Sequence, residues 1–310
     1  MVGGKLLATR FSGQRSLVDD SWLTGPGFEL REPGDGVTMP RSFADIPWPK
    51  VSVVIPTLNE ARNLPYVFSK LPPALHEVII VDGHSVDDTV ATARRLRPDV
   101  RIVTQSRSGK GNALACGFAA ATGDIIAMVD ADGSADPGEI PAFVEALMGG
   151  ADYAKGSRFA TGGGSSDITR LRKAGNWVLS GLVNILCGTR YSDLCYGYNV
   201  FWRRHVPVFG LDADAPAPAD GTRLWGDGFE VETLINIRVA QAGLKVKEVA
   251  SYEHSRIHGV SNLNAASDGW RVLRTIFAER FHYSKKRSEH ASAADLPDWQ
   301  LARDSVSRSR

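Results

Sequence analysis

The sequence predicts an α/β fold with a mainly parallel central sheet, and two observations support this prediction. Short, β-branched apolar runs alternate with segments of helical periodicity between residues 51 and 148, a spacing that is typical of βαβ units. Polar residues follow these apolar runs directly. Because the carboxyl ends of parallel strands meet at the edge of the sheet where ligands bind, we expect a ligand site after residues 56, 82 and 130.

The first half of the chain reads as four strands, each followed by a helix. VSVVIP, EVIIVD, VRIVT and DIIAMVD are short apolar runs, so strands are expected at 51–56, 77–82, 100–104 and 124–130. The helices that follow them are expected at 60–71, 87–97, 109–122 and 137–148. Acidic residues in the first turn of the second helix favour its dipole, and the small residues of the third require close packing.

The pattern is less regular after residue 150. Strands are expected at 152–158, within 192–204 and at 244–253, the last because apolar and polar residues alternate there. Helices are expected at 168–188, 229–243 and 268–281. Gly243 closes the second of these helices. The Pro/Ala/Asp-rich stretch between the second strand and that helix, residues 211–225, is predicted to be a surface loop.

Three regions follow from this pattern. Residues 1–49 contain Gly, Pro and mixed charge with little periodicity, so they are predicted to be an N-terminal extension or arm. Residues 50–283 carry the regular elements and are expected to form one domain. Residues 284–310 are charged and rich in Ser, which predicts a flexible tail.

Composition excludes several classes of protein. The chain has 310 residues, 43% of them hydrophobic, which is enough for a large core. A net charge of +1 argues against a nucleic-acid-binding protein held by bulk charge. The 3 cysteines form no C-x-x-C pair and fit buried thiols in a reducing compartment. The longest apolar stretch, 177–187, is about half of the ~20 residues that a membrane span needs. We therefore expect a cytoplasmic protein, either free or peripheral to the inner face of the membrane.

Asp130 and Asp132 follow the fourth predicted strand in the sequence DADG. Residues alternate faces along an extended chain, so both carboxylates should point to the same side, where their mutual repulsion favours a cation between them. The alternative is a plain turn, since Asp and Gly are ordinary turn formers. Mg²⁺ and Mn²⁺ prefer carboxylate oxygens and complete their coordination with substrate phosphates. The pair therefore predicts a divalent-metal clamp on a diphosphate.

Eight motifs in a fixed order carry a resemblance to a known family: VSVVIPTLNE, EVIIVDGHSVDDT, SGKGNALACGF, DADGSADP, KGSRF, SDLCYGYNVF, GFEVETL and RIHGVSNL. Over residues 50–263 the chain resembles the inverting family 2 glycosyltransferases with the GT-A fold, and among them the dolichyl- or polyprenyl-phosphate sugar synthases. The resemblance implies a Rossmann-like sheet with C-terminal acceptor-side helices. It also implies a UDP- or GDP-linked sugar donor, Mg²⁺ or Mn²⁺ as cofactor, and a polyprenyl phosphate acceptor at the membrane surface.

The resemblance also implies roles for individual residues. Contacts with the donor or metal are implied for Pro56, Leu58, Glu60, Asp82, Lys110, Asp130, Ala131 and Asp132, and phosphate contacts for Arg158, Arg256 and Ser261. This chain departs from its relatives at four positions. Leu58 stands where relatives often have Tyr, Gly83 replaces a second acidic residue, and Ser134 stands where Gln is frequent. The lysine that mannose synthases carry after the serine is Asn262 here.

A hydroxyl acceptor needs a carboxylate to take its proton, whereas an acceptor phosphate is already ionised. Asp227 and Glu230 are the candidate catalytic bases, and Asp193 is another at the acceptor side. Glu230 and Glu232 are alternatively ordinary first-turn acids that stabilise a helix. The alternatives to a lipid-phosphate acceptor are a soluble hydroxyl acceptor such as a glycoside or natural product, a sugar nucleotidyltransferase, and a non-catalytic nucleotide-sugar-binding protein. A homo-oligomer is also open.

Overall fold

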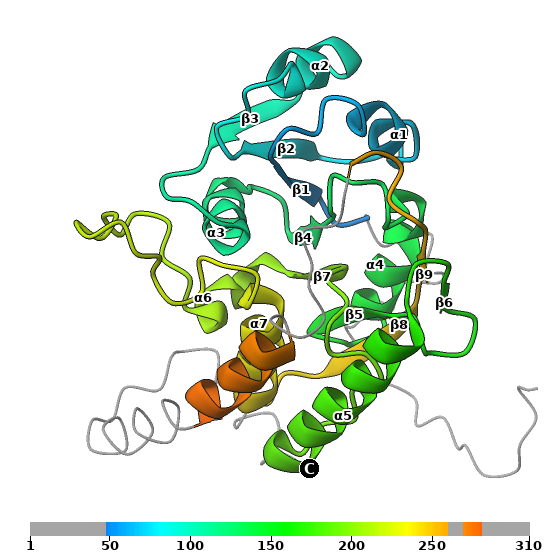
Figure 1. Cartoon of the computed structure of the whole chain (residues 1–310). Coiled ribbons are helices and arrows are strands. Elements are labelled where there is room, and N and C mark those ends of the chain that lie inside the picture. Colours follow the sequence, from blue (N-terminus) through cyan, green and yellow to red (C-terminus); the bar gives the residue numbers. More distant parts are fainter. Residues whose placement is uncertain (1–47, 260–268, 281–310) are drawn as a thin grey trace, which may run out of the picture. The chain divides into compact units, whose positions relative to one another are not determined.

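The computed structural model describes residues 48–259 and 269–280 (Figure 1). Its main feature is a seven-stranded sheet with the order β3-β2-β1-β4-β7-β5-β8. The strands are β1 (Val51–Thr57), β2 (Glu77–Asp82), β3 (Arg101–Thr104), β4 (Ile125–Met128), β5 (Tyr153–Ser157), β7 (Asn199–Trp202) and β8 (Val246–Ala250). Neighbouring strands are parallel except that β7 runs antiparallel to both β4 and β5. The predicted α/β fold with a mainly parallel sheet is confirmed.

Helices cover both faces of the sheet. One core cluster joins a sheet face to α1 (Leu64–Ser69), α2 (Thr89–Leu96) and α4 (Ile140–Met148), the last preceded by the short η3 (Pro137–Glu139). A second cluster joins the other face to α3 (Lys110–Ala120), α6 (Val206–Phe209, after η4, Arg203–His205) and α7 (Val231–Gln241). A third cluster packs α5 (Arg170–Cys187) and the helix over residues 269–280 against α7.

The small residues of α3 pack closely against the sheet, as predicted. A Cβ on Gly117 would lie 2.3 Å from Val54 Cγ1 and 2.9 Å from Val81 Cγ2, so only glycine fits there. This packing fixes the N-terminal end of α3 at the carboxyl edge of β1 and β2.

The strand order creates a crevice for a ligand. The chain runs outward from β1 to β2 and β3, and then returns to place β4 on the other side of β1. Such a reversal is a topological switch point, where the loops after two neighbouring parallel strands diverge and leave a binding crevice. The loops after β1 and β4 carry Glu60, Asp130 and Asp132, so the fold places these residues at that crevice.

The structure differs from the predictions in detail. The predicted strand 244–253 is two strands, because the chain leaves the large sheet at Ser251 and then pairs as β9 (Tyr252–Glu253) with β6 (Gly164–Ser165). Neither β6 nor α6 was predicted, and α1 and α2 are shorter than expected. Residues 211–225 contain no helix or strand, in agreement with the prediction of a loop.

The predicted tail at 284–310 and all but the last two residues of the predicted arm at 1–49 lie outside the described residues, so the domain boundaries stay predictions. Within residues 48–259 and 269–280, no helix is both long enough and apolar enough to cross a membrane.

Candidate active site

A cavity of about 1100 Å³ opens at the carboxyl ends of β1, β2 and β4 and extends to α5. Most of the residues singled out from the sequence line it: Pro56, Leu58, Glu60, Lys110, Asp130, Ala131, Asp132, Arg158 and Arg256. Asp82, Asp227 and Glu230 are not among its lining residues, and Ser261 lies outside the described part of the chain. One cavity therefore gathers side chains from loops that are distant in sequence.

The Asp130-Ala131-Asp132 segment is a turn and not the end of a strand. The strand predicted to reach residue 130 ends at Met128, and residues 131–132 form a turn. Gly133 has a φ of +77° and the Ser134 backbone N–H donates to Asp132 Oδ1 at 2.9 Å, which fixes the turn. Both carboxylates still line the cavity. A turn at this position is therefore compatible with carboxylates that face the cavity, although the sequence treated a turn and a ligand site as alternatives.

Lys110 lies between two carboxylates inside the cavity. Its Nζ is 2.6 Å from Asp130 Oδ1 and 2.6 Å from Glu232 Oε1. Burial lowers the pKa of the Lys110 ammonium, but Asp130 and Glu232 outweigh burial and raise this pKa above its ordinary value. Lys110 is therefore a charged, internal cation of the site and not a solvated surface lysine.

Two glycines place Lys110 at the start of α3. Gly109 has a φ of +121°, and a Cβ on it would lie 2.1 Å from the Asp227 carbonyl oxygen. A Cβ on Gly111 would lie 1.7 Å from the Gly226 carbonyl oxygen, and its N–H donates to Asp227 O at 2.8 Å. The GKG sequence thus lets the backbone of α3 contact the loop before α7, which brings Lys110 and Glu232 together.

Arg256 lies on the loop that follows β9. Its Nη2 is 2.9 Å from Asp132 Oδ2, and its Nη1 is 3.6 Å from Glu60 Oε1. The backbone holds this loop against the Asp130–Asp132 turn, because the Ile257 N–H donates to Asp132 O and the His254 N–H donates to Ser134 O. The predicted phosphate loop and the predicted metal motif therefore form one structural unit.

The charges of this end of the cavity do not balance. Among the described residues, four carboxylates (Glu60, Asp130, Asp132 and Glu232) share two cations, Lys110 and Arg256. Burial raises the pKa of the Glu60 carboxyl, and Asp132 and Asp130 raise it further, while Asn63 and Arg256 lower it. The two uncompensated negative charges equal the charge of one divalent cation.

The donor set fits such a cation only together with a ligand. No group of three or more His, Cys, Asp or Glu side chains is arranged to hold a metal within the described ranges. Mg²⁺ sites usually combine one or two carboxylates with substrate phosphates. Asp130 and Asp132, which face the same cavity, match that pattern.

The acidic residues before and within α7 occupy three different environments. Arg107 forms a buried bidentate pair with Asp227, with N–O distances of 2.8 Å, so the Asp227 carboxylate anchors the loop and does not face the cavity. Glu230 accepts N–H bonds from Gly226 and Gly228 through its Oε1. Only Glu232, which the sequence marked as an ordinary first-turn acid, lines the cavity. The geometry therefore favours Glu232 over both predicted catalytic bases.

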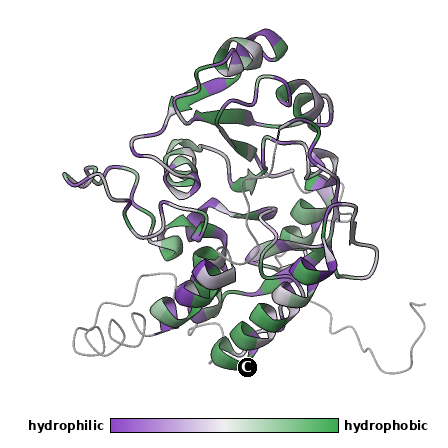
Figure 2. Ribbon diagram, viewed as in Figure 1, coloured by the Kyte–Doolittle hydropathy of each residue, from purple (hydrophilic) through white to green (hydrophobic). Residues whose placement is uncertain are grey.

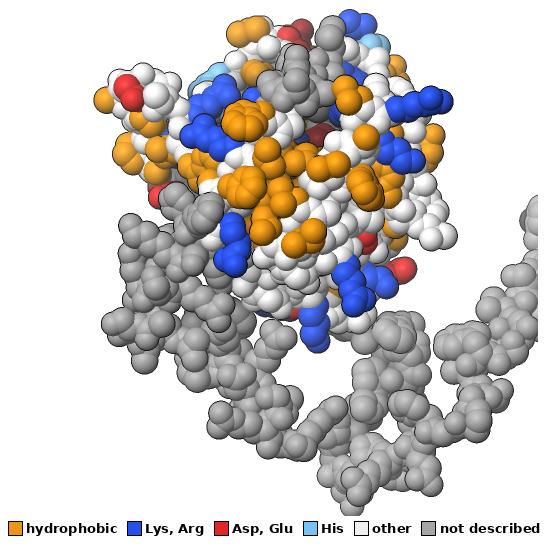
Figure 3. Space-filling view, turned by 60° about the horizontal axis from the view of Figure 1, so that its bottom comes forward, with side chains coloured by type: hydrophobic (Ala, Val, Ile, Leu, Met, Phe, Trp, Pro, Cys, Tyr) orange, Lys and Arg blue, Asp and Glu red, His pale blue; other side chains and the backbone are white. Residues whose placement is uncertain are grey.

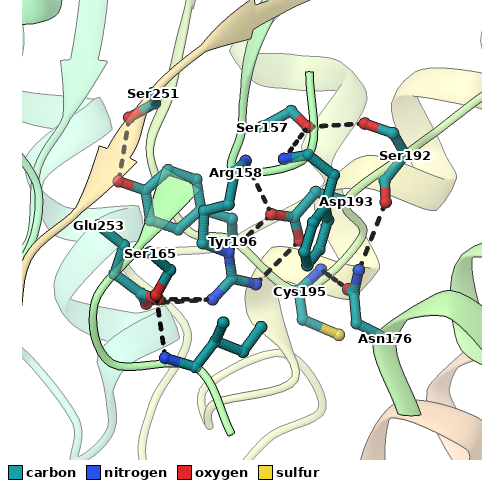
Figure 4. A network of polar contacts seen from close by, with 12 residues as sticks. Ser157, Arg158, Ser165, Asn176, Ser192, Asp193, Cys195, Tyr196, Ser251 and Glu253 are labelled. Carbon is teal, nitrogen blue, oxygen red and sulfur yellow. Dashed lines mark hydrogen bonds and ion pairs between the residues drawn. The ribbon is translucent and has the colours of Figure 1, made fainter. Parts of the chain in front are cut away.

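Arg158 is the centre of a buried polar network (Figure 4). Its Nε and Nη2 donate to both oxygens of Asp193 at 2.7 and 2.9 Å, and its Nη1 donates to Glu253 at 3.0 and 3.1 Å. Its guanidinium also lies 4.9 Å from the centre of the Tyr196 ring. Arg158 lines the cavity, but these carboxylates already engage three of its nitrogens, and Asp193 is fully occupied as its partner.

The remaining predicted donor contacts lie beside β1 and β2. Leu58 is exposed, and Gly83, at the position where the resemblance implied a second acidic residue, lines the cavity. Asp82 is buried, and its Oδ1 has no hydrogen-bond partner in the described structure. Gln105, which follows β3, also lines the cavity. Gln105 was not predicted as a site residue, although its position directly after a predicted strand was a signal that could have found it.

The opposite end of the cavity is apolar. Its apolar lining comes from α5, the loop before it, the loop before α7 and the helix 269–280: Ile168, Leu171, Leu179, Phe229 and Val272. The polar Asp167 and Asn176 line the cavity among them. Arg172 and Arg271, from the same two helices, also line the cavity, whereas Arg223 donates to Ser108 Oγ at 3.3 Å beside the start of α3. The cavity thus joins an acidic, cation-bridged end to a hydrophobic end with a basic border.

A mainly parallel sheet with a carboxylate pair after β4, at the switch point, defines a ligand-binding α/β fold. Comparisons with known proteins identify its family. The model of glycosyl transferase family 2 matches residues 52–206. An uncharacterized glycosyltransferase of Mycobacterium tuberculosis is 42% identical over 72% of this chain and 97% of its own length. The undecaprenyl-phosphate mannosyltransferase of Micrococcus luteus is 29% identical over 72% of this chain and 91% of its own length.

The fold is also found in a solved structure. Glucosyl-3-phosphoglycerate synthase from M. tuberculosis, crystallised with Mn²⁺, UDP and glucosyl-3-phosphoglycerate, aligns with a TM-score of 0.57 and 23% identity over 74% of this chain and 80% of its own. This likeness shows the GT-A fold. The chain belongs to glycosyltransferase family 2 and is a glycosyltransferase, as its motifs predict.

Proposed function

We propose that this enzyme transfers a sugar from a nucleotide diphosphate sugar to a polyprenyl phosphate, with inversion at the anomeric carbon. The observation that carries the proposal is the cavity itself, whose acidic end lies at the switch point and whose other end is walled by apolar side chains from α5 and the helix 269–280. A donor diphosphate suits the first end and an isoprenoid chain suits the second. The names of relatives such as the undecaprenyl-phosphate mannosyltransferase support the acceptor.

Asp130 and Asp132 would hold Mg²⁺ or Mn²⁺ together with the donor diphosphate. When bound, this cation neutralises the charge that develops on the departing nucleoside diphosphate. Arg256, which now pairs with Asp132 and Glu60, can exchange one of these partners for a phosphate oxygen of the donor or acceptor. Lys110 holds Asp130 and Glu232 in place beside the reacting groups.

In the transfer itself, an oxygen of the acceptor phosphate attacks the anomeric carbon while the bond from that carbon to the diphosphate breaks. The acceptor phosphate is ionised and loses no proton, so this reaction needs no catalytic base. Loss of the Asp132 carboxylate should therefore act mainly on turnover. We expect Asp132→Ala to lower kcat by ~10²–10³-fold, comparable to the loss of other groups that stabilise developing charge.

The measurement is the formation of lipid-linked sugar and nucleoside diphosphate with Mn²⁺, a set of nucleotide sugars and a polyprenyl phosphate. Asp136→Asn is the matched control, because Asp136 pairs with Lys70 outside the cavity and should retain activity. Full activity of Asp132→Ala in EDTA would contradict the metal-dependent proposal. Release of pyrophosphate would instead indicate a nucleotidyltransferase, and binding without turnover would indicate a sensor.

Glu232 is the observation that favours a second function, transfer to a soluble hydroxyl acceptor. It is the one residue of the three acids at the start of α7 that lines the cavity, and a hydroxyl group needs a carboxylate base worth ~10²–10⁴-fold. Glu232→Gln separates the two functions. A loss of that size with unchanged donor affinity would identify a base and an alcohol acceptor. Activity within about tenfold of the unmodified enzyme, stimulated by polyprenyl phosphate, would support the lipid-phosphate acceptor.

A further inference from the structure

Helix α5 carries apolar side chains on two sides, one packed inward and one exposed. Val183 is buried, and Leu179, Leu182 and Leu186 pack against the same hydrophobic cluster. Asn176 and Ser180 are buried against the protein. Asn176 accepts an N–H bond from Cys195 at 3.1 Å, and Ser180 Oγ accepts one from Leu194 at 3.1 Å. A helix that packs on a protein core normally buries its apolar stripe. α5 buries such a stripe in its C-terminal half, around Val183, but it also leaves a second apolar stripe exposed.

The outward face of α5 is a continuous apolar stripe. Leu171, Val178 and Ile185 follow each other at intervals of seven residues, so they lie on one side of the helix. Their exposed fractions are 72%, 58% and 83%, and the neighbouring Trp177 is 77% exposed. In Figure 2 the C-terminal part of α5 is mostly coloured as hydrophobic, while its N-terminal part is mixed.

The helix over residues 269–280 packs beside α5 and exposes further apolar side chains. It packs on α5 through Ile276 and Val272, and it exposes Trp270 (69%) and Phe277 (43%). We call the exposed side chains Leu171, Trp177, Val178, Ile185, Trp270 and Phe277 the α5 face. Figure 3, which brings the lower end of the view in Figure 1 forward, shows apolar side chains gathered on one surface with Lys and Arg side chains around them.

The charges around the α5 face are mostly positive. Helix α5 contains no Asp or Glu, and Arg170 and Lys173 are exposed in its first turns. Arg274 and Arg280 are exposed on the second helix, where the acid Glu279 is buried and paired with Arg238. The exposed Asp167, before α5, pairs with Arg172. An apolar strip bordered by cations is complementary to an anionic lipid surface, where apolar side chains enter the acyl boundary and cations meet the headgroups.

We propose that the α5 face docks the enzyme on an anionic lipid bilayer. The inference deepens the proposed function and rests on it, because Leu171 of α5 and Val272 of the second helix also line the cavity. Docking through this face brings the cavity mouth to the bilayer surface. A polyprenyl phosphate then reaches the acidic end of the cavity while its chain stays in contact with lipid.

The test is a flotation assay of the full chain with vesicles of phosphatidylcholine alone or mixed with phosphatidylglycerol. We expect binding to the mixed vesicles that weakens with salt, and a blue shift of tryptophan emission that Trp177→Phe reduces. Val178→Ser and Ile185→Ser should each weaken vesicle binding by about tenfold. Lys173→Gln should weaken it by roughly fivefold. Val86→Ser is the matched control, because Val86 is 92% exposed on the loop before α2 and should leave binding unchanged.

Activity assays with two acceptors separate this inference from the proposed function. The α5-face variants should keep their turnover with a short-chain, water-soluble polyprenyl phosphate and lose it with a long-chain acceptor embedded in mixed vesicles. Vesicle binding without any transfer to polyprenyl phosphates would overturn the proposed function and leave the docking face intact. Absence of vesicle binding, or variants that only convert a dimer into monomers in light scattering, would overturn the docking face.

Discussion

Two arginines border the same cavity and differ in how they are held. Arg158 is 4% exposed, forms a bidentate pair with Asp193 and a further pair with Glu253, and stacks on Tyr196. Arg256 is 30% exposed and reaches Asp132 and Glu60 through one nitrogen each, one of them at 3.6 Å. The difference indicates two roles for an arginine beside the cavity. An arginine that is buried and paired through all its nitrogens stabilises the fold, whereas a partly exposed arginine with single contacts remains available to bind a ligand.

The largest expected effect comes from breaking the enclosed cluster, which consists of Arg158, Asp193 and Glu253. Arg158→Ala should lower the free energy of unfolding by ~3–5 kcal/mol, because it leaves the fully buried Asp193 carboxylate without a cation. Urea denaturation measures this change. Arg97→Ala is the control, since Arg97 pairs with the exposed Asp99 and should cost about 1 kcal/mol or less. A loss for Arg158→Ala no greater than that of the control would show that the cluster does not support the fold.

The open cluster consists of Lys110 and Arg256 with the carboxylates of Glu60, Asp130, Asp132 and Glu232. Breaking it should weaken ligand binding and not the fold. Arg256→Ala should weaken the affinity for the nucleotide diphosphate sugar or the acceptor phosphate by ~10–10²-fold, the usual loss for a charge-assisted contact. Its free energy of unfolding should change by no more than about 1 kcal/mol. Calorimetric titration of donor and acceptor provides the measurement. Arg62→Ala, which removes a neighbour of His258 outside the cavity, is the control; equal affinities for both variants would show that Arg256 does not contact phosphate.

The sequence was sufficient to assign both arginines to the candidate site, but it could not show that one is buried among carboxylates and the other is not. The resemblance implied phosphate contacts for Arg158 and Arg256, and both line the cavity. Their difference depends on Asp193 and Glu253, which are 35 and 95 residues from Arg158. No local pattern encodes those distances, because they result from the antiparallel insertion of β7 and the exit of the chain after β8.

The acids around α7 illustrate the same limit. Asp227, Glu230 and Glu232 lie within six residues, and the sequence gives each of them the same chemistry. Arg107, 120 residues earlier, forms an ion pair with Asp227, and the backbone N–H groups of Gly226 and Gly228 donate to Glu230. Glu232 then faces Lys110 because Gly109 and Gly111 bring the start of α3 against the preceding loop. The order of motifs predicted the site, while side-chain partners from distant strands determined its members.

The smallest expected effect is a change in stability at Glu60. It tests whether the open cluster, with four carboxylates and two cations, carries excess negative charge. Burial, Asp132 and Asp130 raise the pKa of Glu60 above its ordinary value of 4.5, against the opposing effects of Asn63 and Arg256. The folded state therefore holds the Glu60 proton more tightly than the unfolded state does. It follows that this contribution to stability is present at low pH and is lost as the pH rises through the folded pKa.

Glu60→Gln should accordingly raise the free energy of unfolding at neutral pH, by about 1 kcal/mol or less, and flatten its decline above the ordinary pKa of Glu60. Glutamine keeps an oxygen that can accept the Asn63 amide. Glu253→Gln is the contrasting variant, and it should lower stability at the same pH because it removes one of the carboxylates that enclose Arg158. Urea denaturation of both variants between acidic and neutral pH gives the comparison. If both substitutions destabilise the fold, the four carboxylates of the open cluster are already compensated, and the charge argument for a divalent cation between Asp130 and Asp132 loses its basis.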